Sequence, residues 1–315
     1  GGGSSGGSSV ECVTPEEELT LQDYYLQGLL SQGKRLKIPD NVEATSVMFF
    51  KRFYLNASVM DCHPKDVMLT AMWLACKVEH YPHRYLNAEK VLLPPGNRDF
   101  KFDAKAFADL GNLEVEKLIR LEHVLLLALK YHLMVFHGYR PLRGFVEELA
   151  AFWNTHPAAS NPPADTHVKL IRKAAKLVRT VMTSDVPFLF HPSEIALYAL
   201  RSAAAEGNIS IASFMEATLP DPSVRADLDK VCERIGQEMG RWKGRARGED
   251  LKAEAQRIDA KLQGCRNPDR NPAHPQFLQR EAKKLSEKQR TKDDRNHKVA
   301  EEQRRQQSEL LGLEA

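Results

Sequence analysis

Two charged residues stand out because each lies within an otherwise apolar helical pattern. Lys77 is the only lysine or arginine between Lys65 and Arg84, and it follows ten mostly apolar residues. Glu122 lies four residues after Leu118, so it falls within the apolar stripe of its segment. A buried ion without a partner costs on the order of several kcal/mol. Each side chain must therefore find a partner or reach solvent.

Two interpretations of this pair are open. In the first, Lys77 is a cation at a helix C-terminus whose stem lies along apolar surface, and Glu122 is an exposed glutamate at the edge of its stripe. In the second, both side chains project from neighbouring helices onto one surface, where they meet donors and acceptors supplied by another protein. Periodicity alone favours the first interpretation.

The sequence lacks the motifs of the common enzyme classes. It has no Walker A run, no kinase glycine-rich loop, HRD or DFG motif, and no serine or cysteine in a nucleophile context. Glu79, His80 and His83 lie together, but they are better explained as a helix end and the loop after it. The five cysteines are widely spaced, with no C-x-x-C pair. We therefore predict no enzymatic activity, no cofactor and no metal, in a reducing intracellular compartment.

Composition narrows the class further. The 315 residues suggest about two domains, and 42% hydrophobic with 28% charged residues is ordinary for a soluble protein. No run of 18 apolar residues and no secretory signal is present, so no membrane association is expected. The net charge is +3, and the segment 280–305 carries ten basic and six acidic residues. The net charge of the remaining residues is therefore close to zero, which argues against direct nucleic-acid binding.

Helical patterns dominate from Leu19 to about Leu262, and strand patterns are nearly absent. A helix is expected to start at Pro64, where the missing proline N–H costs nothing. It is apolar on nearly every face from Val67 to Val78, which predicts the central helix of a bundle. A second helix is expected over 112–130.

An internal repeat is the most informative signal. The segment 63–75 (HPKDVMLTAMWLA) aligns with 191–203 (HPSEIALYALRSA) at an offset of 128 residues, with the His-Pro pair and three further positions identical. Apolar positions in the preceding helices also align. This period is much longer than that of solenoid repeats. It predicts two similar helical domains of about 100 residues each.

Several motifs, in the correct order, resemble the cyclin family. Residues 51–81 resemble the first three helices of a cyclin box, and 121–135 resemble its fifth helix and exit. Residues 49–60 and 139–149 are most similar to the cyclin H branch of the family. The resemblance covers about 19–265. At Gln22, substrate-recruiting cyclins carry an arginine, so docking through that patch is not implied.

The resemblance implies an all-α fold of two tandem five-helix cyclin boxes with flanking N- and C-terminal helices, near 14–30 and 249–264. The implied organisation follows the chain in five parts. These are a flexible Gly/Ser-rich linker (1–13), the N-terminal helix with the first box (14–134), the second box (135–245), the C-terminal helix (246–266) and a charged, largely disordered tail (267–315).

The resemblance also assigns a role to the charged pair. Lys77 and Glu122 match the signature lysine and glutamate with which cyclins contact a kinase near its mobile C-helix. The adjoining apolar groove falls on Val78, Leu126, Tyr131 and Leu133. This implies a regulatory subunit that binds and activates a cyclin-dependent kinase (CDK).

Likeness to the cyclin H branch implies further partners. These are the catalytic subunit of the CDK-activating kinase, an assembly factor of the ménage-à-trois type and general transcription factor IIH, in the nucleus. The implied substrates are CDK activation loops and the C-terminal domain of RNA polymerase II. Two alternatives remain: another transcriptional cyclin of the C, K or T type, and a DNA-binding adaptor similar to transcription factor IIB. The adaptor would need a zinc ribbon and a basic second repeat, which this sequence lacks.

Overall fold

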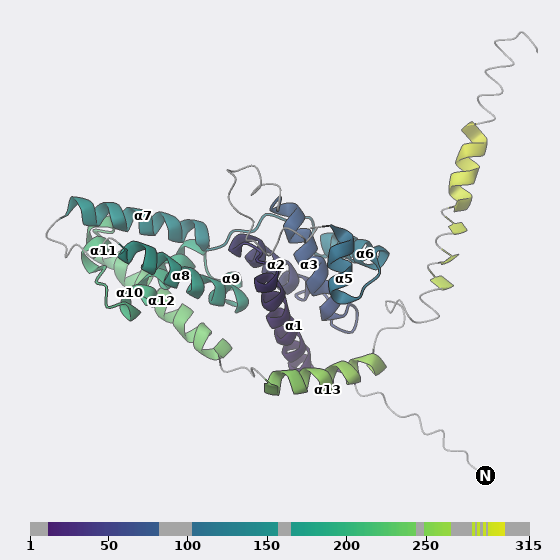
Figure 1. The fold of residues 1–315 in the computed structure, drawn as a ribbon, viewed down its shortest axis with the longest axis horizontal. Coiled ribbons are helices and arrows are strands. Elements are labelled where there is room, and N and C mark those ends of the chain that lie inside the picture. Colours follow the sequence, from purple (N-terminus) through teal and green to yellow (C-terminus); the bar gives the residue numbers. More distant parts are fainter. Residues whose placement is uncertain are drawn as a thin grey trace, which may run out of the picture.

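The structure, a computed structural model, describes residues 12–81, 103–156, 165–243 and 249–265, together with short helical stretches within 279–299. Within these ranges the chain is helical and contains no strand, which confirms the all-α prediction. The helices are α1 (Pro15–Arg35), α2 (Asp40–Phe53), α3 (Pro64–Val78), α5 (Ala104–Gly111), α6 (Val115–Ala128), α7 (Tyr139–Thr155), α8 (Thr166–Thr183), α9 (Val186–Leu189), α10 (Pro192–Glu206), α11 (Ala212–Thr218), α12 (Pro222–Lys243) and α13 (Glu249–Cys265). They form two groups joined end to end, α1 to α6 and α7 to α12 (Figure 1).

The first bundle is built around α3. This helix begins at Pro64, as predicted, and the Nδ1 atom of His63 accepts the backbone N–H of Lys65 at 3.1 Å to cap it. It packs against α1, α2, α5 and α6. Met72 and Leu69, at 1% exposure each, lie in the core with Phe49 and Phe50 of α2. A helix surrounded in this way can be apolar on nearly every side.

The second bundle repeats this plan. Its central helix α10 starts at Pro192 after His191, and it packs against α7, α8, α9 and α12. The backbone N–H of His191 donates to Glu194 at 2.7 Å. α3 and α10 are therefore equivalent in sequence and in position, as the repeat predicts.

One sequence expectation fails locally. The segment 51–81 does not contain three helices: it holds the end of α2 and all of α3. The residues between Phe53 and Pro64 form turns, with Asp61 and Cys62 donating backbone N–H groups to Ser58. The Gly/Ser segment 1–11 lies outside the described residues, and the described parts of 279–299 are helical and exposed.

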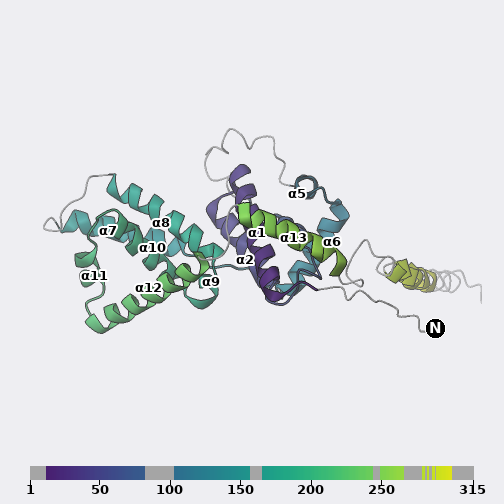
Figure 2. The same ribbon diagram turned by 90° about the horizontal axis from the view of Figure 1, so that it is seen from below.

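The last helix of the body leaves the second bundle and returns to the first. α13 crosses the lower end of α1 in Figure 1, lies in front of it in the view from below in Figure 2, and packs against it. Ala255, Ile258 and Leu262, all fully buried, pack against Leu21 and Val59 of the first bundle. The flanking helices expected near 14–30 and 249–264 thus pack against each other.

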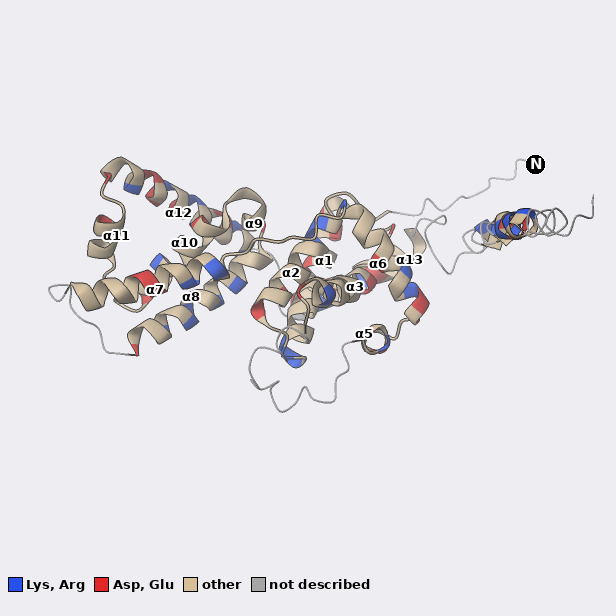
Figure 3. Cartoon of the chain, turned by 90° about the horizontal axis from the view of Figure 1, so that it is seen from above, with Lys and Arg blue, Asp and Glu red and all other residues tan. Residues whose placement is uncertain are grey.

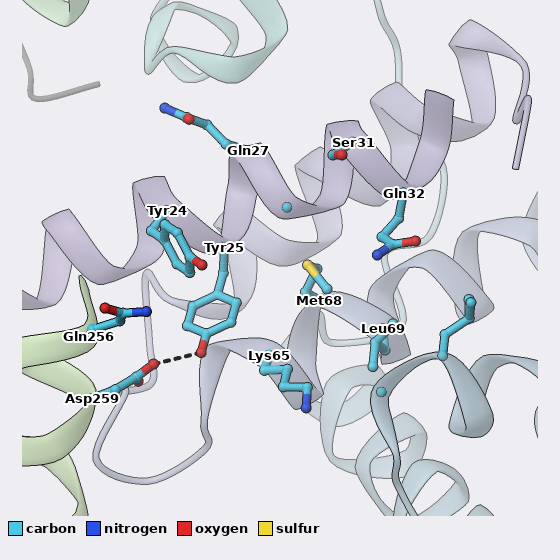
Figure 4. A pocket seen from close by; sticks show the side chains of 13 residues that line it. Tyr24, Tyr25, Gln27, Ser31, Gln32, Lys65, Met68, Leu69, Gln256 and Asp259 are labelled. Carbon is cyan, nitrogen blue, oxygen red and sulfur yellow. Dashed lines mark hydrogen bonds between the residues drawn. The ribbon is translucent and has the colours of Figure 1, made fainter. Parts of the chain in front are cut away.

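Polar contacts fix the register of α13. Glu17 accepts from Arg257 at 2.6 Å and from Lys261 at 2.9 Å, and these cations lower its pKa to about 2. Asp259 accepts from the Tyr25 hydroxyl at 2.7 Å and lies 3.0 Å from Nε2 of His63. Figure 4 shows this contact at one end of a pocket of about 640 Å³ between α1, α3, α5 and α13.

Two cations join the bundles. Arg179 of α8 forms a bidentate ion pair with Glu43 of α2, at 2.5 and 2.7 Å, and Glu43 is only 4% exposed. Lys51 of α2 pairs with Asp185 at 2.8 Å and donates to the carbonyl of Ser184, beyond the end of α8. Acidic and basic residues occur together on α12, whereas α8 carries lysines and arginines but no acidic residue (Figure 3).

Glycine is required at the end of α5. A Cβ atom at Gly111 would lie 2.1 Å from Cδ1 of Leu69, inside the core of the first bundle. We expect Gly111→Ala to lower the free energy of unfolding by about 1–3 kcal/mol, measured by urea denaturation. Gly144 in α7 is the matched control, because a Cβ there meets nothing within 4 Å. Gly144→Ala should raise stability by about 0.5–1 kcal/mol. Equal effects of the two substitutions would contradict the packing described here.

Candidate functional site

Lys77 and Glu122 come together between two packed helices of the first bundle. The Nζ atom of Lys77, in the last turn of α3, donates to Oε1 of Glu122 in the middle of α6. The lysine side chain is 49% exposed, whereas that of the glutamate is 10% exposed. The two residues thus project from neighbouring helices onto one surface, as in the second interpretation, which the resemblance to cyclins favours. The glutamate is therefore buried rather than at an exposed edge, and the lysine and one further donor satisfy its carboxylate.

That further donor is Trp73, which was not among the residues predicted from the sequence. Its indole Nε1–H donates to Oε2 of Glu122 at 3.1 Å, so both carboxylate oxygens accept a hydrogen bond. The Lys77 ammonium also lies 5.4 Å from the centre of the Trp73 ring, within cation–π range. The available signal was spacing, because Trp73 precedes Lys77 by one helical turn.

This arrangement holds a cation at the surface in a fixed place. Glu122 is anchored by its burial and by Trp73, so it orients the Lys77 ammonium without occupying all three of its N–H groups. An ammonium has three N–H groups, and half of this side chain faces solvent. The site can therefore donate hydrogen bonds to a carbonyl or carboxylate of another molecule.

The four predicted groove residues divide into two kinds. Val78, Leu126 and Leu133 are half-buried and pack against the core of the first bundle. Tyr131 is different: it is 56% exposed, just beyond the end of α6. The structure brings all four to the ends of α3 and α6, but only Tyr131 projects mainly into solvent.

Exposed apolar residues extend this region beyond the predicted set. Leu127 is 54% exposed, Met134 75% and Phe136 74%. Large apolar side chains this exposed and this close along the chain are typical of a protein-binding surface. We refer to one set of residues as the α3/α6 surface: Lys77, Glu122, the four groove residues Val78, Leu126, Tyr131 and Leu133, and the exposed residues Leu127, Met134 and Phe136.

Comparison with known proteins gives two family matches that follow one another along the chain. The family described as "Cyclin, N-terminal domain" matches residues 10–134, and "Cyclin C-terminal domain" matches residues 137–263. The first match contains the α3/α6 surface up to Met134. The second match contains the second bundle and most of α13.

Relatives with curated names agree. The chain is 31% identical to "Cyclin-H" of Xenopus laevis over 224 residues, which cover 67% of this chain and 60% of the relative. It is 26% identical to "Cyclin-H1-1" of Arabidopsis thaliana, covering 84% of this chain and 72% of the relative. The chain therefore spans about 60% of the length of the Xenopus protein.

A solved structure is similar over most of the chain. It is described as the structure of the CAK complex from Chaetomium thermophilum bound to ATP-γ-S, and the matching chain is 28% identical with a TM-score of 0.67. The match covers 88% of this chain and 81% of the other. With both domain families matched in order over residues 10–134 and 137–263, and with relatives named cyclin-H, the chain belongs to the cyclin family.

Proposed function

We propose that this chain is a regulatory subunit that binds a cyclin-dependent kinase through the α3/α6 surface. The observation that carries the proposal is the oriented Lys77–Glu122 pair beside exposed apolar residues. A charged anchor within an apolar patch is typical of interfaces whose binding energy is concentrated in a few residues. We assign this surface, except for Phe136, to a first box at 14–134, and Phe136 to the start of a second box at 135–245.

The kinase would carry out phosphoryl transfer, and this chain would stabilise the active conformation of the kinase. By binding the active arrangement of the kinase C-helix preferentially, a rigid helical surface shifts the kinase population towards it. In that arrangement the lysine–glutamate ion pair of the kinase forms and positions ATP. The fixed orientation of Lys77 suits this role, because a preorganised donor loses little entropy on binding.

Similarity to proteins named cyclin-H and to a chain of the CAK complex supports a CDK-activating kinase subunit. On this proposal the substrates are CDK activation loops and the C-terminal domain of RNA polymerase II. A ménage-à-trois-type assembly factor and general transcription factor IIH would be partners, in the nucleus. Another transcriptional cyclin is the second candidate, and it differs in the kinase that it binds.

The test is capture with a readout of activity. The immobilised full chain is incubated with nuclear extract of its own organism, and the retained proteins are identified by mass spectrometry and assayed for kinase activity. We expect one predominant CDK that phosphorylates CDK activation loops. Retention of a mediator-type or elongation-type CDK instead would support the second candidate. Retention of no kinase would overturn the proposal.

A further inference from the structure

The turn after α6 contains an unusual backbone conformation. Six described non-glycine residues have positive φ, and five of them, Lys37, His80, Asn112, Lys130 and Asn208, each lie at or next to a helix C-terminal cap. That position commonly adopts the left-handed conformation. The sixth is Tyr131, with φ 58°, which directly follows Lys130 with φ 51°. Two successive left-handed residues with side chains cost conformational free energy.

The turn is tight as well as strained. The Tyr131 N–H donates to the carbonyl of Leu126, and the Leu133 N–H donates back to the carbonyl of Tyr131, both at 3.0 Å. Tyr131 within the turn, and Met134 and Phe136 just after it, are each more than half exposed. A strained segment persists only where its surroundings hold it in place.

Arg52, from the last turn of α2, supplies one such contact. Its Nη1–H donates to the carbonyl of His132 at 2.8 Å, across 80 residues of sequence. Arg52 is partly buried, and no carboxylate of the described residues pairs with it. Its burial lowers the pKa of Arg52. A partly buried cation that gains a carbonyl but no carboxylate adds little to stability, so a role in placing the turn is the more informative one to test.

We infer that Arg52 is a positioning residue of the α3/α6 surface: by binding the His132 carbonyl, it holds the strained 130–133 turn in the conformation that presents Tyr131 and the following apolar residues to the kinase. This inference rests on the proposed function. The holding contact is made before the kinase arrives, so Arg52 acts by preorganisation.

The test compares binding with stability. Arg52→Met keeps much of the side-chain volume but removes the donor and the charge. We expect its melting temperature to equal or exceed that of the wild-type chain, while its Kd for the purified CDK captured above rises at least tenfold. A purely structural arginine would lower the melting temperature and the affinity together. Arg52→Gln, which is polar and shorter, is the second variant if the methionine variant does not fold.

A rescue variant tests the mechanism directly. Glycine adopts positive φ without cost, and Lys130 is exposed, so Lys130→Gly should ease the turn while keeping its backbone hydrogen bond to Leu127. We expect Lys130→Gly alone to bind within threefold of wild type, and to restore most of the affinity lost by Arg52→Met. Wild-type binding by Arg52→Met, or its failure to be rescued, would overturn the inference. If charge changes at Lys77 and Glu122 also leave binding intact, the proposed function itself has failed.

Discussion

The charge-exchanged variant, which combines Lys77→Glu with Glu122→Lys, is expected to fold and to lose about a hundredfold in affinity for its kinase. The exchange preserves an ion pair between α3 and α6 but reverses the charge that the α3/α6 surface presents. Stability should fall by about 1–2 kcal/mol, because the Trp73 indole N–H loses its acceptor. Binding is measured by calorimetry with the purified kinase, and stability by urea denaturation.

The single reversals separate the two effects. Glu122→Lys alone places a second cation beside Lys77, at position 122, where the native residue is only 8% exposed. It should therefore lower both stability and binding. Lys77→Glu alone places two carboxylates together, and it should weaken binding as strongly. Lys230→Glu is a matched control, because Lys230 is 71% exposed and lies on α12 of the second bundle. Wild-type affinity of the exchanged variant would contradict a role for the pair in kinase binding.

Arg179→Met is expected to lower the free energy of unfolding by about 3 kcal/mol at pH 7.5, the largest stability effect that we foresee. It leaves the Glu43 carboxylate, 4% exposed, without its bidentate partner. Arg179 is itself partly solvated, which places the loss at the lower end of the usual range for a broken buried pair.

The loss should be smaller at pH 5. Burial outweighs the arginine and raises the pKa of Glu43 in the folded chain. A carboxyl group whose pKa is higher in the folded than in the unfolded chain binds more protons when folded. Its contribution to stability therefore falls as the pH rises from the unfolded pKa through the folded pKa. Removing Arg179 raises the folded pKa further, and protonation at pH 5 then relieves the unpaired charge. Urea denaturation at the two pH values measures this.

A double variant is the control for the buried pair. Arg179→Met with Glu43→Gln removes both charges. The difference between the stability losses at pH 5 and pH 7.5 should therefore vanish, and most of the stability should return. A loss from Arg179→Met that is the same at pH 5 and pH 7.5 would show that Glu43 reaches water in the folded chain.

Local and periodic features of the fold could be predicted from the sequence. The start of α3 at Pro64 follows from the backbone chemistry of proline, and its central position follows from apolar residues on every face. The repeat predicted that α10 would occupy the equivalent place. That Lys77 and Glu122 share one surface was implied by the resemblance to cyclins, whereas periodicity alone favoured separate positions, and their pairing with each other was not predicted.

Contacts between segments far apart in sequence could not be predicted in the same way. Glu43 follows Asp40 in a polar stretch that looks like an exposed first turn, yet it is buried because α8 brings Arg179 over it. The return of α13 to α1 depends on Asp259 and Glu17, whose partners lie more than 190 residues away. Their spacing within their own helices carries no sign of those partners.

The central claim is that the ends of α3 and α6 bind the kinase, and hydrogen exchange of the purified complex tests it most directly. We expect kinase binding to slow exchange of the backbone amides in 124–136 and around Lys77, with little change in α11 and α12. Protection confined to the second bundle, with 124–136 exchanging as in the free chain, would contradict the account.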